Sequence, residues 1–225
     1  MCDNRKPIQS NLKKEVKQLI IIGAGGYGRE AFTQAKQSIG YGKEFIVKGY
    51  LDGNQNALTG FYGYPPVLGP IEDYSIKIDD VFICAIGDVT IRRKTVNEIL
   101  EKEGKFINLI HKSCRIGDSV QLGTGLFISY DVIISNDSVI KDYVLINSRA
   151  IIGHDCRVES FSLIGVNSFL AGNVTVMEDV TIHPKASIMQ GLTIYDGAKV
   201  GLGSVVVKDV KEDSTVFGNP AKVIF

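Results

Sequence analysis

The pattern of hydrophobic and polar residues divides the chain into two parts with different periodicities. In the first part, four short apolar runs predict strands, and they are residues 17–22, 44–52, 80–87 and 105–110. Two segments between these runs, residues 29–39 and 90–104, have the spacing of amphipathic helices. The second segment ends at a glycine, which is a common helix stop. Strands that alternate with helices predict a parallel sheet.

From Ile110 onward the hydrophobic pattern has a strict period of six residues. Seventeen successive positions, from Ile110 to Val206, are all Ile, Leu or Val. Four places after each of these comes a second, smaller class of residue, from Cys114 to Ser204. A short fixed period of this kind is typical of a parallel β-helix, in which each face turns one large and one small side chain inward. Equivalent side chains of neighbouring coils then stack in columns.

A glycine-rich motif, GAGGYG at residues 23–28, follows the first predicted strand and precedes the first predicted helix. Asp52 lies 24 residues beyond Gly28, at the end of the second predicted strand. This context is typical of a dinucleotide-binding motif, so an NAD-dependent oxidoreductase is one interpretation. The segment before the β-helix, however, has room for only half of a dinucleotide-binding fold.

Composition and charge narrow the function classes. The chain has 25 basic and 25 acidic residues, so no net charge favours binding to nucleic acid or to a membrane surface. Residues 1–17 are polar and lack the apolar run of a secretory signal, and we expect them to form a flexible segment. The four cysteines, at positions 2, 84, 114 and 156, have none of the close spacings of a zinc site. We therefore expect a reduced, cytoplasmic protein.

The three histidines differ in their surroundings. His154 lies two places after an inward aliphatic position, which predicts an outward or turn position, and Asp155 adjoins it. His111 and His183 are 72 residues apart, or four coils of 18 residues, which is too far for one metal ion within a chain. We expect His111 to be structural, at the domain junction. No metal is expected, although a site shared between chains stays open.

The order of motifs along the chain resembles the NeuD/PglD family of bacterial sugar acetyltransferases, which belong to the hexapeptide-repeat acyltransferases. The matching motifs are GAGGYGRE, LDG, AIGDVTIRRK, INLIHKS, the HD pair in GHDC, AGNV and GNPAK. The resemblance implies an N-terminal half-Rossmann parallel sheet at 18–108. A left-handed β-helix with a C-terminal tail follows at 109–225. It also implies a homotrimer with active sites between subunits, and acetyl-CoA as co-substrate.

The same resemblance assigns roles to residues of the β-helix. His154 matches the family's general base, and Asp155 matches the carboxylate beside it, which is normally a glutamate. Neutral imidazole, with an ordinary pKa of about 6.5, accepts a proton well near neutrality. We expect acetyl-CoA to contact Gly172, Leu163, His183 and Gly201. Leu163 departs from the family, because members often carry a second histidine at that place.

The glycine motif is implied to hold a nucleotide sugar. Backbone amides at a helix N-terminus bind anionic groups such as a diphosphate. The expected contacts are Gly23, Gly25, Gly26, Tyr27 and Gly28, with Asp52 at the sugar, the ribose or the base edge.

These observations together predict an N-acetyltransferase acting on a nucleotide-linked 4-amino-4,6-dideoxyhexose, for surface polysaccharide or glycan synthesis. A sugar or sialic acid O-acetyltransferase is the alternative nearest in chemistry. A non-catalytic nucleotide-sugar-binding scaffold is an alternative from another class, beside the oxidoreductase. The sequence leaves open the nucleotide, the sugar and the length of the acyl chain.

Overall fold

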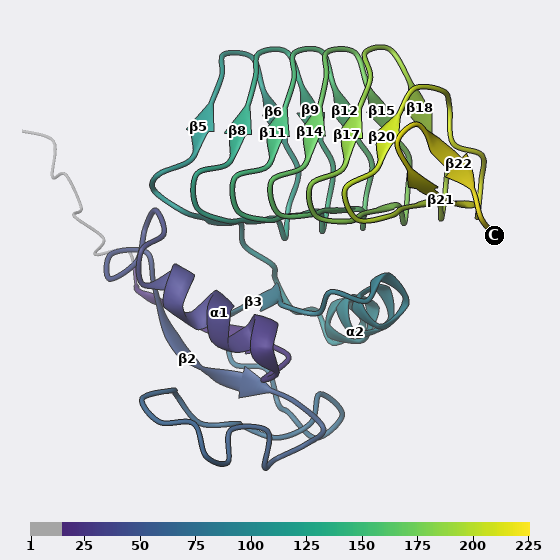
Figure 1. Cartoon of the computed structure of the whole chain (residues 1–225). Helices are drawn as coiled ribbons and strands as arrows, with labels where there is room; N and C mark the ends of the chain where they lie inside the picture. The colour runs from purple at the N-terminus through teal and green to yellow at the C-terminus, as the bar shows by residue number, and fades with distance from the viewer. Residues whose placement is uncertain (1–14) are drawn as a thin grey trace, which may run out of the picture.

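Three parallel strands form the sheet of the N-terminal domain, in the order β2-β1-β3. They are β1 (Lys17–Ile22), β2 (Phe45–Leu51) and β3 (Asp80–Cys84). Helices α1 (Gly26–Ala35) and α2 (Val89–Glu101) cover opposite faces of this sheet (Figure 1). The computed structural model describes residues 15–225, so most of the predicted flexible segment lies outside the described residues. No helix in the described part is long and apolar enough to cross a membrane.

Two sequence expectations for this domain were wrong in detail. The fourth predicted strand, 105–110, does not form a strand of this sheet. Phe106 alone bridges to Phe82 of β3, and Leu109 already begins the β-helix. The first helix begins on the glycine motif itself and ends at Ala35, so Ile39 lies beyond it and is 62% exposed.

Seventeen two-residue strands follow in the described chain, and each contains one of the predicted aliphatic positions as its second residue. They are β4 (Leu109–Ile110), β5 (Arg115–Ile116), β6 (Gln121–Leu122), β7 (Phe127–Ile128), β8 (Ile133–Ile134), β9 (Val139–Ile140), β10 (Leu145–Ile146), β11 (Ile151–Ile152), β12 (Arg157–Val158), β13 (Leu163–Ile164), β14 (Phe169–Leu170), β15 (Thr175–Val176), β16 (Thr181–Ile182), β17 (Ser187–Ile188), β18 (Thr193–Ile194), β19 (Lys199–Val200) and β20 (Val205–Val206). A hairpin of β21 (Thr215–Gly218) and β22 (Ala221–Val223) ends the chain.

Each short strand pairs in parallel with the strand 18 residues later, as Leu145 with Leu163. Three sheets result, and they contain β4-β7-β10-β13-β16-β19, β5-β8-β11-β14-β17-β20 and β6-β9-β12-β15-β18. The inward aliphatic column and the smaller inward column form one continuous buried cluster. The predicted fold class, a half-Rossmann sheet followed by a left-handed β-helix, is confirmed.

The corners of the β-helix have a regular backbone conformation that the sequence pattern did not predict. Every sixth residue from 119 to 203 has a positive φ. Eleven of these residues are not glycine, and their φ values lie between 56° and 62°. Left-handed backbone costs a residue with a side chain roughly 1–2 kcal/mol. The energy gained by stacking the coils offsets this cost at each corner.

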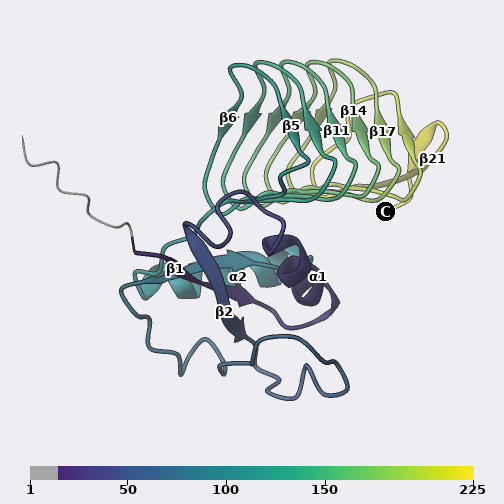
Figure 2. The same ribbon diagram turned by 90° about the vertical axis from the view of Figure 1, so that its left-hand side faces the viewer.

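The N-terminal domain lies against the first sheet of the β-helix (Figure 2). On the early coils the outward side chains of this sheet are apolar, namely Leu109, Phe127 and Leu145, and they are buried with residues of β1 and α1. On later coils the outward residues are Thr181 and Lys199. The domain therefore covers only part of this face and leaves the later coils open.

His111 connects the two domains, as expected of a structural histidine. Its Nδ1 accepts the backbone N–H of Ser113 at 3.1 Å. Its Nε2 therefore carries the proton and donates to Gln37 Oε1 at 3.0 Å. Burial lowers the pKa of His111 below its ordinary value, partly opposed by Asp131.

The corner conformation predicts the effect of a substitution at Gly203. Its φ is +68° and no atom lies within 4 Å of the position that a methyl group would take, so only the backbone opposes a side chain there. We expect Gly203→Ala to lower the free energy of unfolding by about 1 kcal/mol, measured by denaturant titration. Gly203→Asn is the control, because asparagine tolerates this conformation, and it should lose less. Equal stability of the alanine variant and the wild type would contradict the argument.

The lowered pKa of His111 predicts a pH dependence of stability. Below about pH 6.5 the unfolded chain binds a proton at this residue that the folded chain does not. The stability is therefore fully present above that pH and falls as the pH drops toward the folded-state pKa. Between pH 7.5 and 5.5, wild type should lose more free energy of unfolding than His111→Gln. Identical losses, by chemical denaturation, would mean that the folded and unfolded pKa values of His111 are equal.

Candidate functional site

A cavity of about 580 Å³ lies at the carboxyl ends of the three parallel strands. Most of the predicted nucleotide-sugar contacts line it, and these are Gly23, Gly25, Gly26, Tyr27 and Asp52. Since α1 begins at Gly26, its first backbone N–H groups lie at this cavity and provide donors for an anionic group.

Gly28 does not line the cavity, although it belongs to the predicted set. A Cβ at this position would collide with the carbonyl oxygen of Gly23. Gly28 is therefore needed for close packing between the helix and the loop before it.

Asp52 is already engaged by the backbone. Its Oδ2 accepts the N–H of Ala24 at 2.8 Å, and its Oδ1 accepts the N–H of Asn54 at 2.8 Å. The carboxylate thus holds the glycine loop against the end of β2. Each oxygen keeps acceptor capacity, so the predicted contact with a ligand is compatible with this arrangement.

Tyr27 of the glycine motif contacts the β-helix. Its hydroxyl donates to Asn147 Oδ1 at 2.8 Å, and its ring packs on Phe127 with centroids 5.3 Å apart. Burial raises the pKa of Tyr27, so the hydroxyl stays protonated and keeps this hydrogen bond. The glycine loop is therefore attached directly to the β-helix.

His154 and Asp155 form a hydrogen-bonded pair at the corner between β11 and β12. The distance from His154 Nδ1 to Asp155 Oδ2 is 2.6 Å, and both side chains are more than half exposed. Asp155 is itself a corner residue, with φ of 57°. Because the carboxylate accepts a hydrogen bond from Nδ1–H, the neutral ring has a free lone pair at Nε2.

Gly172, one coil beyond His154, provides the space for its imidazole. A Cβ on Gly172 would lie 2.5 Å from both Cε1 and Nε2 of that ring. The ring therefore rests directly over the glycine backbone. The sequence predicted a contact between Gly172 and the thioester, and the structure shows a different reason for a glycine at this position.

A groove of about 1040 Å³ runs between α2 and the open part of the first β-helix sheet. Leu163 and His183, two of the predicted acetyl-CoA contacts, line it together with Thr181 and Lys199. Gly201 does not line the groove, and the ring of Phe217 covers Gly201. Of the four predicted acetyl-CoA contacts, Leu163 and His183 therefore share the groove of one chain, whereas Gly172 and Gly201 lie outside it.

Sequence reasoning missed two residues of α2. Lys94 is the residue that lines both the cavity and the groove in the described chain. Arg92 is fully buried, on the same helix face as Val96 and Ile99. The spacing of these three positions was a usable signal, because an arginine on an apolar helix face needs a buried partner.

Within residues 15–225, no group of three or more His, Cys, Asp or Glu side chains is arranged to hold a metal ion. Cys84 and Cys156 are buried, and within the described residues neither forms a disulfide. Burial raises the pKa of Cys84 to about 11, so its thiol stays protonated at neutral pH. Both cysteines are packing residues.

Comparison with known proteins identifies relatives of both domains. The family model for the PglD N-terminal domain matches residues 18–99. GDP-perosamine N-acetyltransferase of Escherichia coli O157:H7 is 28% identical over 212 residues, which are 90% of this chain and 94% of that protein. The chain spans 61% or less of the length of three other curated acetyltransferases that it matches.

Two solved structures match nearly the whole chain. The acetyltransferase domain of PglB from Neisseria gonorrhoeae has 30% sequence identity and a TM-score of 0.82, over 92% of this chain and 100% of that one. It has also been solved with acetyl coenzyme A. PerB from Caulobacter crescentus, in complex with CoA and GDP-perosamine, has 29% identity and a TM-score of 0.81, over 93% and 98%.

These matches extend over both domains, in the order predicted from the motifs, and the matched proteins are acetyltransferases. The predicted enzyme class, acyltransferase, is confirmed. The NAD-dependent oxidoreductase is set aside, since the described sheet has three strands and forms half of such a fold. The chain belongs to the NeuD/PglD-type sugar acetyltransferases of the hexapeptide-repeat acyltransferase superfamily.

Proposed function

We propose that this protein transfers an acetyl group from acetyl-CoA to the amine of a nucleotide-linked 4-amino-4,6-dideoxyhexose, with His154 as general base. The observation that carries the proposal is the exposed His154–Asp155 pair, with Nε2 free and the ring resting on Gly172. The relatives that are named for an acceptor, GDP-perosamine N-acetyltransferase and PerB, favour an amine over a hydroxyl.

The geometry of the pair suits the chemistry of acyl transfer. Asp155 holds Nδ1–H and stabilises the imidazolium that forms during the reaction. Nε2 accepts the proton of the sugar amine as the amine nitrogen bonds to the thioester carbon. When the carbon–sulfur bond breaks, the imidazolium returns that proton to the CoA thiolate. Protons and electron pairs then balance, and His154 is restored.

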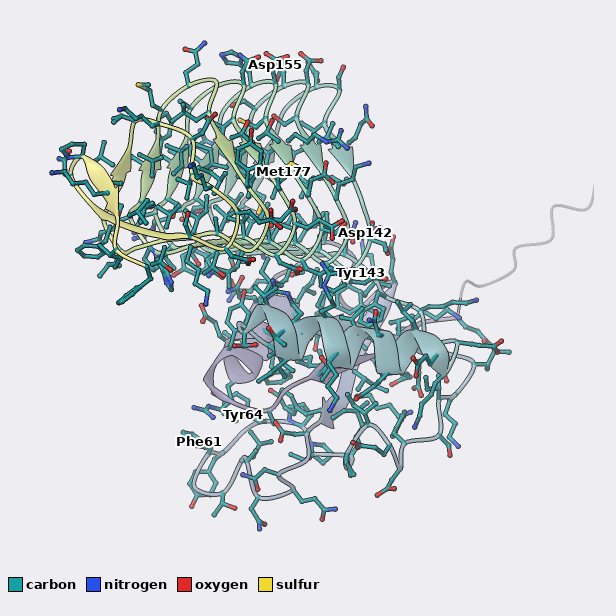
Figure 3. The ribbon with its side chains drawn as sticks, turned by 90° about the vertical axis from the view of Figure 1, so that its right-hand side faces the viewer. Phe61, Tyr64, Asp142, Tyr143, Asp155 and Met177 are labelled. Atoms are coloured by element: carbon teal, nitrogen blue, oxygen red, sulfur yellow. The ribbon has the colours of Figure 1, made fainter. Side chains whose placement is uncertain are left out.

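A single chain does not bring the two sites together. The cavity for the nucleotide sugar lies in the N-terminal domain, whereas Asp155 lies on the edge of the β-helix away from that domain (Figure 3). A second copy of the chain is therefore needed, with the base of one subunit facing the groove of another. We propose a homotrimer, as the family resemblance implies, because a closed ring gives every cavity a base.

An apolar strip on the second sheet supports this assembly. Ile133, Ile151 and Phe169 are outward residues of paired strands on three successive coils. Ile151 is 37% exposed and Phe169 is 44% exposed, although both are large and apolar. The corner that holds His154 directly follows β11, the middle strand of this strip, so a neighbouring subunit that covers the strip would approach the base.

Removing the base should abolish transfer. We expect His154→Asn to lower kcat at least about 100-fold, because general base catalysis contributes 10²–10⁴. The assay is thiol release from acetyl-CoA with UDP-, dTDP- and GDP-linked 4-amino sugars and with their 4-hydroxyl counterparts. The thermal unfolding midpoint of the variant should not change. Near-normal kcat in the variant would refute the role of His154. Release only with hydroxyl acceptors would indicate the O-acetyltransferase, and silence in wild type would indicate the binding scaffold.

Filling the space at Gly172 should act through the base. Its φ is outside the left-handed region, so Gly172→Ala strains no backbone, but the methyl group displaces the imidazole. We expect kcat to fall by at least about 10-fold while the KM for acetyl-CoA changes little. The opposite pattern, a raised KM for acetyl-CoA with normal kcat, would show that this glycine serves the thioester and not the base.

A further inference from the structure

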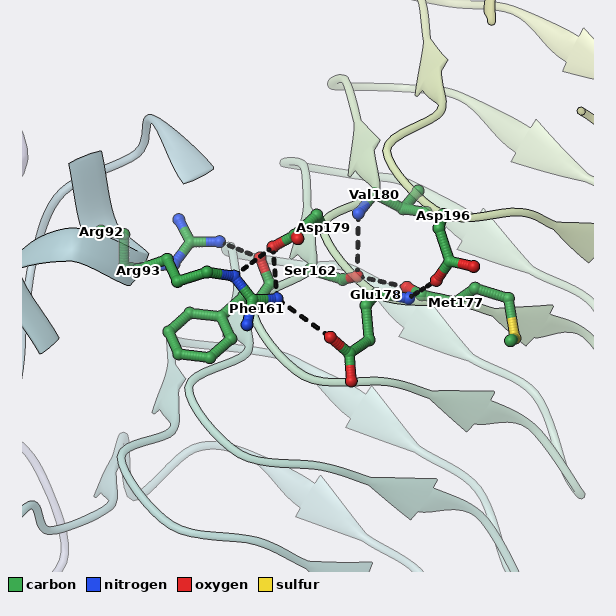
Figure 4. Close-up of polar contacts among 9 residues, drawn as sticks. All are labelled: Arg92, Arg93, Phe161, Ser162, Met177, Glu178, Asp179, Val180 and Asp196. Carbon is green, nitrogen blue, oxygen red and sulfur yellow. Dashed lines mark hydrogen bonds and ion pairs between the residues drawn. The ribbon is translucent and has the colours of Figure 1, made fainter. Parts of the chain in front are cut away.

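Arg92 joins three backbone segments of the two domains. Its Nη1 donates to the carbonyl oxygens of Ile86 and Gly87, at 3.0 Å each, on the loop that follows β3. Its Nη2 donates to the carbonyl oxygen of Phe161, at a corner of the β-helix (Figure 4). The loop lines both the cavity, at Ile86, and the groove, at Gly87. One side chain thus ties the substrate-facing loop to the β-helix.

The environment of Arg92 is costly for a cation. The side chain is completely buried, and its Nε has no hydrogen-bond partner in the described part of the chain. The three acceptors of its N–H groups are neutral carbonyls. A buried charge without an opposite charge in contact contributes little net stability. Stability alone therefore does not account for an arginine at this position.

Arg93 strengthens the same attachment from the groove side. Its Nε and Nη2 donate to Asp179 Oδ1 at 3.1 and 2.8 Å, and Nη2 also donates to Glu178 Oε2 at 3.0 Å. The guanidinium lies 4.1 Å from the ring centroid of Phe161. Phe161 and Asp179 occupy the same corner of successive coils, so both arginines hold one column of the β-helix.

This corner column is itself rigid. Ser162 Oγ donates to the carbonyl oxygen of Met177 at 2.7 Å and accepts the N–H of Val180 at 3.1 Å. The N–H of Glu178 donates to Asp196 Oδ1 at 2.9 Å (Figure 4). These bonds join neighbouring coils, so the arginines are anchored to a fixed support.

Other polar attachments between the domains lie at the two ends of α1, including the backbone bonds from Ile39 N–H to Ile110 O and from Lys112 N–H to Gln37 O. The Tyr27–Asn147 hydrogen bond lies near its first turn. The His111–Gln37 hydrogen bond lies just beyond its last turn. Attachments at the two ends of one helix are least effective against rotation about the line that joins them. The attachment of α2, on the opposite face of the sheet, lies off that line and opposes this rotation, together with the packing of Phe106 on Tyr143.

We infer that Arg92 and Arg93 are positioning residues, which set the orientation of the nucleotide-sugar cavity relative to the β-helix. The inference rests on the proposed function, in which a sugar held at the cavity must reach a base on a neighbouring β-helix. Loss of this attachment leaves each binding site intact and moves one site relative to the other. Such misplacement lowers kcat more than it weakens binding.

A charge-swap cycle tests the inference. Arg93→Glu and Asp179→Arg should each lower kcat about 10-fold or more. The double variant should recover most of the loss, because it restores the ion pair in reverse. Arginine fits the corner, since Arg149 has a φ of 60° at an equivalent position. Calorimetric affinities for UDP, dTDP and GDP should stay within about twofold of wild type in all variants.

A matched control separates this effect from the loss of any surface ion pair. Arg157 pairs with Glu159 on the β-helix, so Arg157→Glu should leave kcat unchanged. Arg92→Lys retains the charge but cannot reach all three carbonyls, and should show the same kcat loss with normal nucleotide affinity. If Arg92→Lys does not fold, the charge-swap cycle of Arg93 and Asp179 is by itself the test of the inference.

Three results would overturn the inference. They are normal kcat in Arg93→Glu, no recovery in the double variant, and a loss of nucleotide affinity equal to the loss of kcat. All three presuppose an active wild type. An inactive wild type, tested with every amine and hydroxyl acceptor, would instead refute the proposed function.

Discussion

The left-handed backbone conformation at every sixth residue of the β-helix is the constraint on which the site depends. It turns the chain at each corner, so that one large and one small side chain face inward on every six-residue face. His154 immediately precedes such a corner, and Asp155 occupies it. The short distance between imidazole and carboxylate therefore follows from the same turn that closes each coil. The stacking of coils, in turn, brings Gly172 directly against the imidazole ring.

The corners serve a second purpose where they meet the N-terminal domain. Tyr143 and Phe161 hold the left-handed conformation in spite of bulky side chains, and their rings stack with centroids 4.9 Å apart. Phe106, in the segment between the domains, packs edge-on against Tyr143. Burial of this aromatic column offsets the cost of the unfavourable backbone. The corners at Tyr143 and Phe161, whose backbone conformation is unfavourable, are thus part of the domain interface.

Most side chains of the glycine motif and its surroundings are engaged within the protein. Asp52 holds the loop, Tyr27 reaches the β-helix, and Gly28 permits close packing of α1. The groups that remain unengaged are chiefly backbone N–H donors at the start of α1, which suit an anionic diphosphate. Motif residues can therefore be correctly placed at a ligand cavity while several of them act on the protein itself.

The sequence by itself determined the β-helix, its 18-residue register, the half-Rossmann sheet and the adjacency of His154 and Asp155. Inward side chains repeat at a fixed period, and the repeat is legible because burial restricts each column to one size of residue. The corner conformation had a weaker signature, because Gly, Asp and Asn occupy ten of the fifteen corners from 119 to 203, but residues as different as lysine and phenylalanine also adopt it. Only the tertiary structure showed that Gly172 seats the imidazole, that Arg92 is buried between domains, and that His154 and the cavity lie on different sides of one chain. These relations join residues distant in sequence, and they depend on side-chain shape and domain orientation, which periodicity does not encode.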